Sequence, residues 1–165
     1  MLQILDMSHQ KLITKFYQAF QQKDYRTMAS CYHEDATFKD PVYELQGKHI
    51  HAMWHMLLER GKEFSLVFSE VEVFDNTASA NWTASYRFNL TDLKVVNPVS
   101  ASFIIQDGLI ITHNDNFDLY AWERQALGLP GVLMGWSPYM KNKLRSYAEK
   151  ALNAFIAAHP EYQHD

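Results

Sequence analysis

The stretch SANWTASYRFNL, residues 79–90, alternates apolar or small side chains with polar ones along its whole length. The first set comprises Ala80, Trp82, Ala84, Tyr86, Phe88 and Leu90. Successive side chains of a β-strand point to opposite faces, so this pattern predicts a strand with one buried and one solvated face. Such one-sided burial is typical of an antiparallel sheet whose other face is covered.

Three further β-like runs lie around this stretch. The run at residues 64–74 changes phase midway, from Phe64, Leu66 and Phe68 to Val71 and Val73. One extra residue in a strand produces such a shift, so we expect a β-bulge near Ser69 and Glu70 that bends the sheet. The last two runs meet at Asp107 and Gly108, a pair typical of a tight hairpin, and the final strand is expected at residues 109–117.

Three helices are expected before the sheet. Apolar residues at helical spacing predict the first up to residue 20, with Ser8 as its N-cap. Asp24 is expected to cap a second helix that extends through Tyr32. The third is predicted between Gly47 and Gly61, where apolar residues recur at i, i+3, i+4, i+7 and i+8.

The chain beyond the last strand predicts a helical extension. A short helix is expected at residues 119–127, followed by a break at residues 128–131. Ser137 and Pro138 then start an amphipathic helix that should pack either on the cone or across a dimer, with residues 128–136 as a loop near a pocket mouth. We therefore expect one α+β domain over residues 1–165. Its cone-like curved antiparallel sheet carries three N-terminal helices on the concave face, and residues 128–165 form a C-terminal helical extension.

Composition excludes several classes of function. The 165 residues carry 15 Lys and Arg against 19 Asp and Glu, a net charge of −4 without charge blocks, so we expect no nucleic-acid partner. No apolar run is long enough for a membrane helix, and no signal peptide or membrane partner is expected. The single cysteine, Cys31, excludes an intramolecular disulfide and favours a cytoplasmic location.

Asp40 is the first candidate for chemistry. It shares a strand face with Ala36, Phe38 and Val42, where burial would raise its pKa and suit it to proton transfer. The alternative is a solvent-facing turn residue, because Asp40 precedes Pro41 and Asp-Pro is a common turn pair.

His113 and Asp115 are the second candidates. In the final strand they share the apolar face with Leu109, Ile111 and Phe117. Two ionisable groups there indicate either an acid/base pair at the bottom of a pocket or an internal hydrogen bond that only fixes the strand.

The remaining polar motifs predict no cofactor. His51 and His55 lie four residues apart on the third helix, but the sequence places no third ligand, so no metal is expected. Cys31 has no basic neighbour and is expected to be inert. Five aromatic side chains are expected to face the interior, namely Tyr17, Trp54, Trp82, Tyr86 and Phe88. They either belong to the core or, if the cone keeps a cavity, line a site for a flat, apolar organic ligand.

Two segments resemble a known family. FYQAFQQKDYRTMASCYHEDATFKDPV, residues 16–42, is similar to the opening of SnoaL-like polyketide cyclases and ketosteroid isomerases, and residues 112–128 are similar to the closing strand and helix of SnoaL-like proteins. The resemblance covers about three-quarters of the chain and implies the cone fold of the nuclear transport factor 2-like superfamily.

The resemblance also implies roles for the candidates. The aspartate before proline is the proton-shuttling base of the isomerases and corresponds to Asp40, whereas an acid on a late strand serves the cyclases and corresponds to Asp115. The isomerases have a tyrosine and a protonated aspartate where this chain has Phe16 and Ala101, so steroid isomerisation is not expected. The related epoxide hydrolases use an Asp-Arg-Asp set, and Arg87, the only strand arginine, is expected on the polar face.

The sequence leaves two functions open. One is a cofactor-independent acid/base enzyme of isomerase, cyclase or lyase type, in which Asp115, His113 and Asp40 act on a small apolar carbonyl compound. The other is a non-catalytic domain that binds a small ligand or a protein. A homodimer is expected in either case, through a polar outer sheet face that includes Thr83, Ser85 and Arg87.

Overall fold

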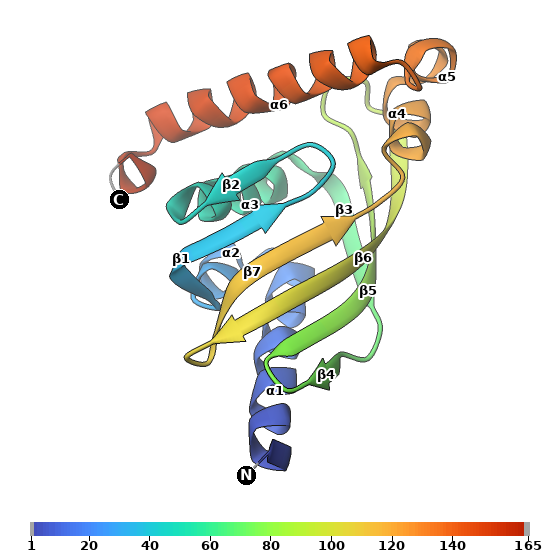
Figure 1. The fold of residues 1–165 in the computed structure, drawn as a ribbon. Coiled ribbons are helices and arrows are strands. Elements are labelled where there is room, and N and C mark those ends of the chain that lie inside the picture. The colour runs from blue at the N-terminus through green and yellow to red at the C-terminus, as the bar shows by residue number, and fades with distance from the viewer. Residues whose placement is uncertain (1, 164–165) are drawn as a thin grey trace.

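The computed structural model describes residues 2–163 and shows an α+β fold (Figure 1). Its elements in chain order are α1 (Leu2–Gln21), α2 (Tyr25–Ala29), β1 (Tyr32–Lys39), β2 (Glu44–Gln46), α3 (Lys48–Arg60), β3 (Lys62–Phe68), β4 (Glu72–Phe74), β5 (Thr77–Arg87), β6 (Lys94–Gln106), β7 (Leu109–Asn116), α4 (Leu119–Leu127), α5 (Leu129–Met134), α6 (Pro138–Ala158) and the 3₁₀ turn η1 (Pro160–Tyr162).

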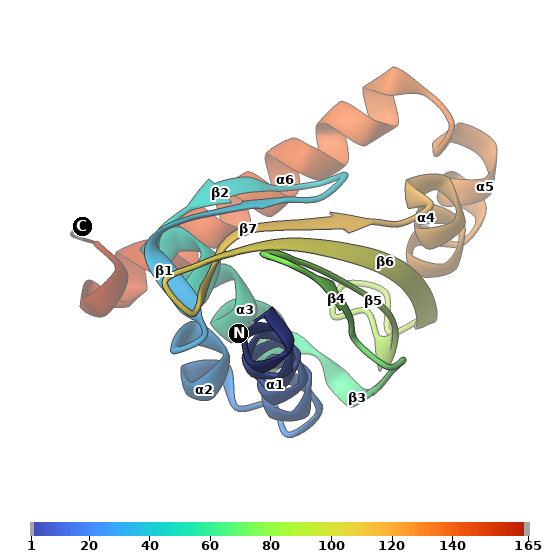
Figure 2. The same cartoon turned by 60° about the horizontal axis from the view of Figure 1, so that its bottom comes forward.

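The seven strands form one curved sheet in the order β2-β1-β7-β6-β5-β3, with β4 also paired to β5. Helices α1, α2 and α3 lie on its concave side (Figure 2). The fold class is therefore confirmed, with one difference in pairing: β1 runs parallel to β7, so the sheet is mixed. Helix α3 and the five strands β2 to β6 separate β1 from β7 in the chain, which gives room for a parallel connection that no hairpin could make.

The bulge expected from the phase shift is present. Phe68 pairs with Trp82 and Glu72 with Ser79, so four steps along β3 and β4 match three along β5. The extra residue restores burial of Val71 after Leu66. This bend turns the sheet around the core, as the sequence predicted.

A second bulge corrects the expected face of the last strand. Ile104 pairs with Thr112 but Ile105 with Ile110, so Ile111 is the extra residue of β7. The buried side chains are consequently Ile110, His113 and Asp115 rather than Leu109 and Ile111. The Asp107-Gly108 hairpin itself is confirmed, and both residues have positive φ, at 53° and 75°.

Two helix boundaries differ from expectation. Helix α1 begins at Leu2, so Ser8 lies inside it; no glycine or proline interrupts residues 2–8, and the helical ladder simply continues. Asp24 does cap α2, accepting a hydrogen bond from the Thr27 N–H, but this helix ends at Ala29. Tyr32 opens β1 instead, because pairing with Ile110 outweighs the short helical pattern.

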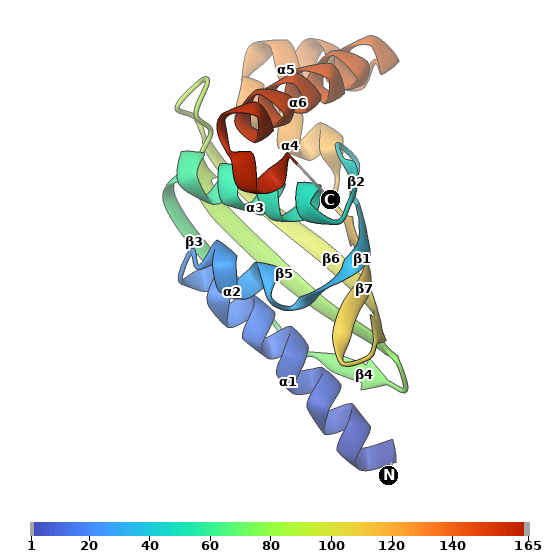
Figure 3. The same ribbon diagram turned by 90° about the vertical axis from the view of Figure 1, so that its left-hand side faces the viewer.

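The C-terminal helices close one end of the cone. Helix α6 crosses this end from α5 to α3, and η1 lies against α3 (Figure 3). Ser137 caps α6 as expected, through the Met140 N–H. The expected loop at residues 128–136 is wrong in part, because Leu129–Met134 form helix α5 once Gly128, with φ 63°, has reversed the chain direction.

No helix within residues 2–163 is long and apolar enough to cross a membrane. Cys31 is buried, and burial raises the pKa of its thiol. The cytoplasmic location stays a prediction.

Candidate functional site

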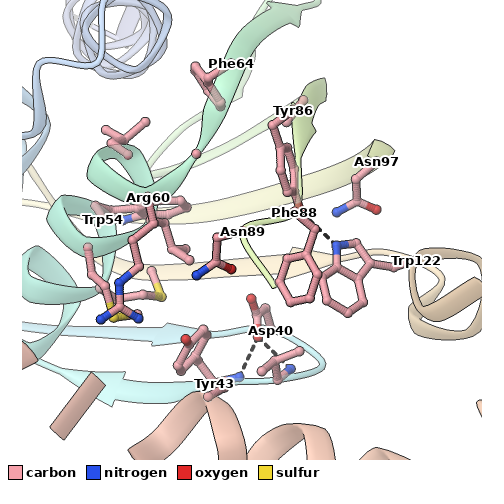
Figure 4. A pocket seen from close by; sticks show the side chains of 18 of the residues that line it. Asp40, Tyr43, Trp54, Arg60, Phe64, Tyr86, Phe88, Asn89, Asn97 and Trp122 are labelled. Carbon is pink, nitrogen blue, oxygen red and sulfur yellow. Dashed lines mark hydrogen bonds between the residues drawn. The ribbon is translucent and has the colours of Figure 1, made fainter. Parts of the chain in front are cut away.

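A cavity of about 190 Å³ lies at the closed end of the cone. Its walls come from the inner face of β5, from α3 and from α6, with the loop after β1 on one side (Figure 4). Most of the side chains that line it are apolar, including Phe20, Met53, Trp54, Phe64, Trp82, Tyr86, Phe88, Phe117, Trp122 and Leu144. Against this background, Asp115 and Asp40 are its two lining carboxyl groups.

Asp115 is held from behind by buried partners. Its Oδ1 lies 3.0 Å from His113 Nε2 and accepts a hydrogen bond from Trp82 Nε1 at 3.3 Å. On the other side of the imidazole, His113 Nδ1 lies 2.6 Å from the hydroxyl of Tyr32, which accepts a further bond from Trp54 Nε1 at 3.0 Å. His113 is 1% exposed and Asp115 6%, so only the acid reaches the cavity.

The donors and acceptors in this series of hydrogen bonds show where Tyr32 and His113 carry their protons. An indole N–H can only donate, so the Tyr32 hydroxyl accepts from Trp54 and has its own proton free for His113 Nδ1. A carboxylate can only accept, so His113 carries a proton on Nε2 and donates it to Asp115 Oδ1; the neutral imidazole then accepts the Tyr32 proton at Nδ1. Asp115 is thus an oriented carboxylate with two donors on one oxygen and its other oxygen unassigned.

Asp40 combines both interpretations that its sequence allowed. It lies just past β1 in a turn, where its Oδ1 accepts the backbone N–H groups of Val42 and Tyr43 at 2.7 and 2.6 Å. Its side chain nonetheless points into the cavity (Figure 4). Burial raises its pKa to about 6; the two backbone donors oppose this, and the negative charge of Asp115 adds to it.

Four of the five predicted aromatic residues line the cavity: Trp54, Trp82, Tyr86 and Phe88. Phe88 does so from the loop just after β5. Tyr17 does not line the cavity; it is fully buried in the core and stacks on Phe68 with ring centroids 5.0 Å apart.

Other lining residues could not be found from the sequence. Asn89 and Asn97 bring amide groups to the cavity, and Leu144 and Tyr147 come from α6 (Figure 4 shows both amides). The sequence pattern places Tyr32 in a helix and so does not predict its hydrogen bond to His113. Of these residues, only those in α6 could be anticipated. The spacing of its apolar residues predicted that the helix is packed, but not which surface it is packed against.

Arg87 reaches the cavity wall, but its polar partners in residues 2–163 are not the two carboxyl groups of the cavity. Arg87 contacts Glu63 at 3.0 Å and the Asp92 carbonyl at 2.9 Å. The histidine His113 occupies the position beside Asp115. This arrangement differs from an Asp-Arg-Asp set.

Within the described residues, the group of potential metal ligands that contains His55 does not include His51. His51 and His55 both lie outside the cavity lining. The structure groups His55 with Glu59 and His159 instead.

Comparison with solved structures places the fold among known ones. An LEH-like epoxide hydrolase of M. tuberculosis is 18% identical with a TM-score of 0.63, covering 78% of this chain and 96% of that one. A candidate polyketide cyclase from Xanthomonas campestris is 17% identical with a TM-score of 0.63, covering 73% and 98%. A protein from Catenulispora acidiphila with a ketosteroid isomerase-like fold, in complex with trimethylamine, is 13% identical with a TM-score of 0.65, covering 77% and 97%.

Sequence comparison identifies the family. Among curated proteins, no sequence matches the chain significantly. The model of the SnoaL-like domain matches residues 13–113, from α1 to His113 in β7. That match covers more than half of the chain, which therefore belongs to the SnoaL-like domain family.

Proposed function

We propose that this protein is a cofactor-independent acid/base enzyme of isomerase, cyclase or lyase type that acts on a small apolar carbonyl compound. The observation that carries the proposal is Asp115, a carboxylate that faces an apolar cavity while Trp82 and His113 hold it from behind. A purely structural acid would not need to reach the cavity.

In this proposal Asp115 removes a proton from the carbon next to the substrate carbonyl. The electron pair of the broken C–H bond forms a C=C bond, and the π pair of the carbonyl moves to its oxygen to give an enolate, to which an amide of Asn89 or Asn97 donates a hydrogen bond. His113 is a positioning residue, because it contacts Asp115 and not the cavity. Asp115 then returns the proton to the substrate. Alternatively, protonated Asp40 donates one, after which Asp115 loses its proton to water and Asp40 regains one from water.

Asp40 fits the second role because its pKa of about 6 lies near neutrality. A group with such a pKa exists in both protonation states in a useful proportion and can give or take a proton. Its bound Oδ1 fixes the carboxyl, which leaves the other oxygen for the substrate.

The cavity favours a flat, largely apolar ligand. Aromatic faces of Trp54, Trp82, Tyr86 and Phe88 surround it, and polar groups are few. Such pockets bind by burying apolar area and use the few polar groups for orientation.

Proton exchange tests the proposal without knowledge of the product. A panel of cyclic and aromatic ketones is first screened for a rise in the thermal unfolding midpoint. Each binder is then incubated with the protein in D₂O, and loss of the proton signal at the carbon next to the carbonyl is followed by NMR. We expect Asp115→Asn to slow this exchange at least about 100-fold, the usual share of a general base.

The matched control is Asp107→Asn, which makes the same change in the exposed Asp107-Gly108 hairpin and should leave exchange unaltered. Unchanged exchange in both Asp115→Asn and Asp40→Asn would refute the mechanism. Binders without any exchange in the wild type would instead favour the non-catalytic ligand-binding domain.

We also propose a homodimer formed through the outer face of the sheet. Thr83 and Ser85 of β5 lie there beside exposed Val67 of β3, which pairs with Thr83. A face that is neither covered nor fully polar is suited to pairing with a second copy. Light scattering should give twice the chain mass at micromolar concentration, and Val67→Lys should lower it; a monomer mass for the wild type would contradict the proposal.

A further inference from the structure

Three potential ligand groups meet outside the cavity, between α3 and the end of α6. His55 and Glu59 lie one turn apart on α3, and His159 follows α6. One donor atom from each lies within 4.8 Å of the other two. The two histidines are 104 positions apart in the sequence, so the packing of the C-terminal extension, not local spacing, creates this group.

Both imidazoles are already oriented by their second nitrogen. His159 Nδ1 lies 2.8 Å from the Phe155 carbonyl oxygen, which can only accept, so this nitrogen carries the proton and Nε2 keeps a free lone pair. His55 Nδ1 lies 3.1 Å from the Tyr162 hydroxyl. Metal-bound histidines usually have such a partner on the ring nitrogen that does not bind the metal.

Ring contacts also restrict the two side chains. His55 stacks on Tyr25, with centroids 3.7 Å apart and planes at 13°. His159 stacks on Phe155 at 3.9 Å. His55 Nε2 faces Glu59 at 3.9 Å, and the Glu59 side chain is 61% exposed.

We propose that His55, Glu59 and His159 bind a divalent transition-metal ion, with Zn²⁺ as the best match. Two imidazoles and one carboxylate are a ligand set that zinc accepts, and the fourth position is open to water. Bonds of about 2.0–2.2 Å would place the ligand atoms about 3.3 Å apart, so the group must contract by about 1.5 Å at most. His55 Nε2 and Glu59 already lie 3.9 Å apart, so any larger movement brings these two side chains and His159 together.

The bound ion would join α3 to the C-terminal extension. Helix α6 lines the cavity through Leu144, Tyr147, Ala148 and Ala151. A metal at the far end of α6 would therefore stabilise the wall of the cavity without contacting any ligand in it. This role is independent of whether the cavity catalyses a reaction.

The test uses the full chain without an affinity tag, first stripped with EDTA. Calorimetric titration with Zn²⁺ should give one ion per chain, Co²⁺ should give the visible absorption of a nitrogen- and oxygen-bound ion, and Zn²⁺ should raise the unfolding midpoint. Glu59→Gln and His159→Gln should abolish these signals. Tyr162→Phe should weaken Zn²⁺ binding about 10- to 100-fold, because it removes only the partner of His55.

The matched control is His49→Gln, an exposed histidine on α3 outside the group, which should bind as the wild type does. Unfolding midpoints of the metal-free variants equal to that of the metal-free wild type show that the substitutions leave the fold intact. Absence of Zn²⁺ binding in the wild type, or equal binding by the Glu59 and His159 variants, would overturn the proposal.

Discussion

Two opposing effects act on the pKa of Asp40. Burial raises its pKa to about 6, above the ordinary 3.8, although two backbone N–H groups favour its charge. Between these two pH values the folded chain binds more protons at this site than the unfolded chain, so stability falls as the pH rises through this window. The charged Asp40 at neutral pH thus costs stability, which is common in residues kept for chemistry.

Asp40→Asn should therefore stabilise the protein above pH 6. The amide keeps an oxygen for the N–H groups of Val42 and Tyr43 and removes the charge. We expect a gain of at most about 3 kcal/mol, since one pKa unit corresponds to about 1.4 kcal/mol, and the gain should vanish near pH 4. Urea unfolding at pH 4 and pH 7 measures it, and an equal effect at both values would contradict the assignment.

Tyr32 is the residue on which the Asp115 arrangement depends. Tyr32→Phe leaves His113 Nδ1 and Trp54 Nε1 without their shared partner in a buried site. We expect a loss of about 1–3 kcal/mol in unfolding free energy for each group left unpaired. Nitrogen NMR of His113 should show the proton on Nε2 in the wild type. Tyr139→Phe, at a tyrosine that is 65% exposed, is the control and should change neither measurement.

The sequence predicts the residue-level site only in part. Alternation along the last strand placed His113 and Asp115 together, because a strand period of two is a local rule. The alternation rule could not place three further residues, Tyr32, Asn89 and Asn97. Each of them reaches the site through strand pairings or loops that depend on the whole sheet. Tyr17 shows a different limit of the sequence. Its apolar, inward-facing position fits a core residue as well as a residue of the cavity wall.

At the scale of elements, the two β-bulges show when a bulge can be predicted from the alternation of apolar and polar residues. The bulge between β3 and β4 appears in the sequence as a phase shift between two apolar sets. The bulge at Ile111 leaves no such trace, because Leu109, Ile110 and Ile111 are all apolar and either phase satisfies the pattern. A bulge is thus predictable only where apolar and polar residues alternate on both sides of it.

Gly128 separates the helices that follow the sheet. Its φ of 63° and ψ of −134° belong to a region that side-chain-bearing residues avoid, and an added Cβ would lie 3.3 Å from Leu93 Cδ1. Gly128→Ala should lower the unfolding free energy by about 1–3 kcal/mol. Denaturant unfolding measures this, and a neutral result would show that α5 can leave α4 at another angle.

At the scale of the whole molecule, α6 is a wall of the cavity as well as a cover for α3. Leu144 and Ala148 are buried where they line the cavity, and Leu152 and Phe155, 3% and 7% exposed, join the core. The family model ends at residue 113, so this wall lies outside the part of the chain that defines the family. Differences in the C-terminal extension would thus change the cavity without changing the cone.

Removing residues 129–165 should therefore open the cavity and expose the apolar surface of α3. Burial of one large apolar side chain stabilises a fold by about 1.5–3 kcal/mol, and the deletion withdraws several of them from the core. We expect lower solubility, a lower unfolding midpoint and loss of ligand binding. A milder test is Leu152→Ala, with an expected loss of about 2–5 kcal/mol, against Lys150→Ala, an exposed position of the same helix, as control. A truncated protein that stayed soluble, equally heat-stable and able to bind the same ketones would show that α6 is an appendage and not a wall.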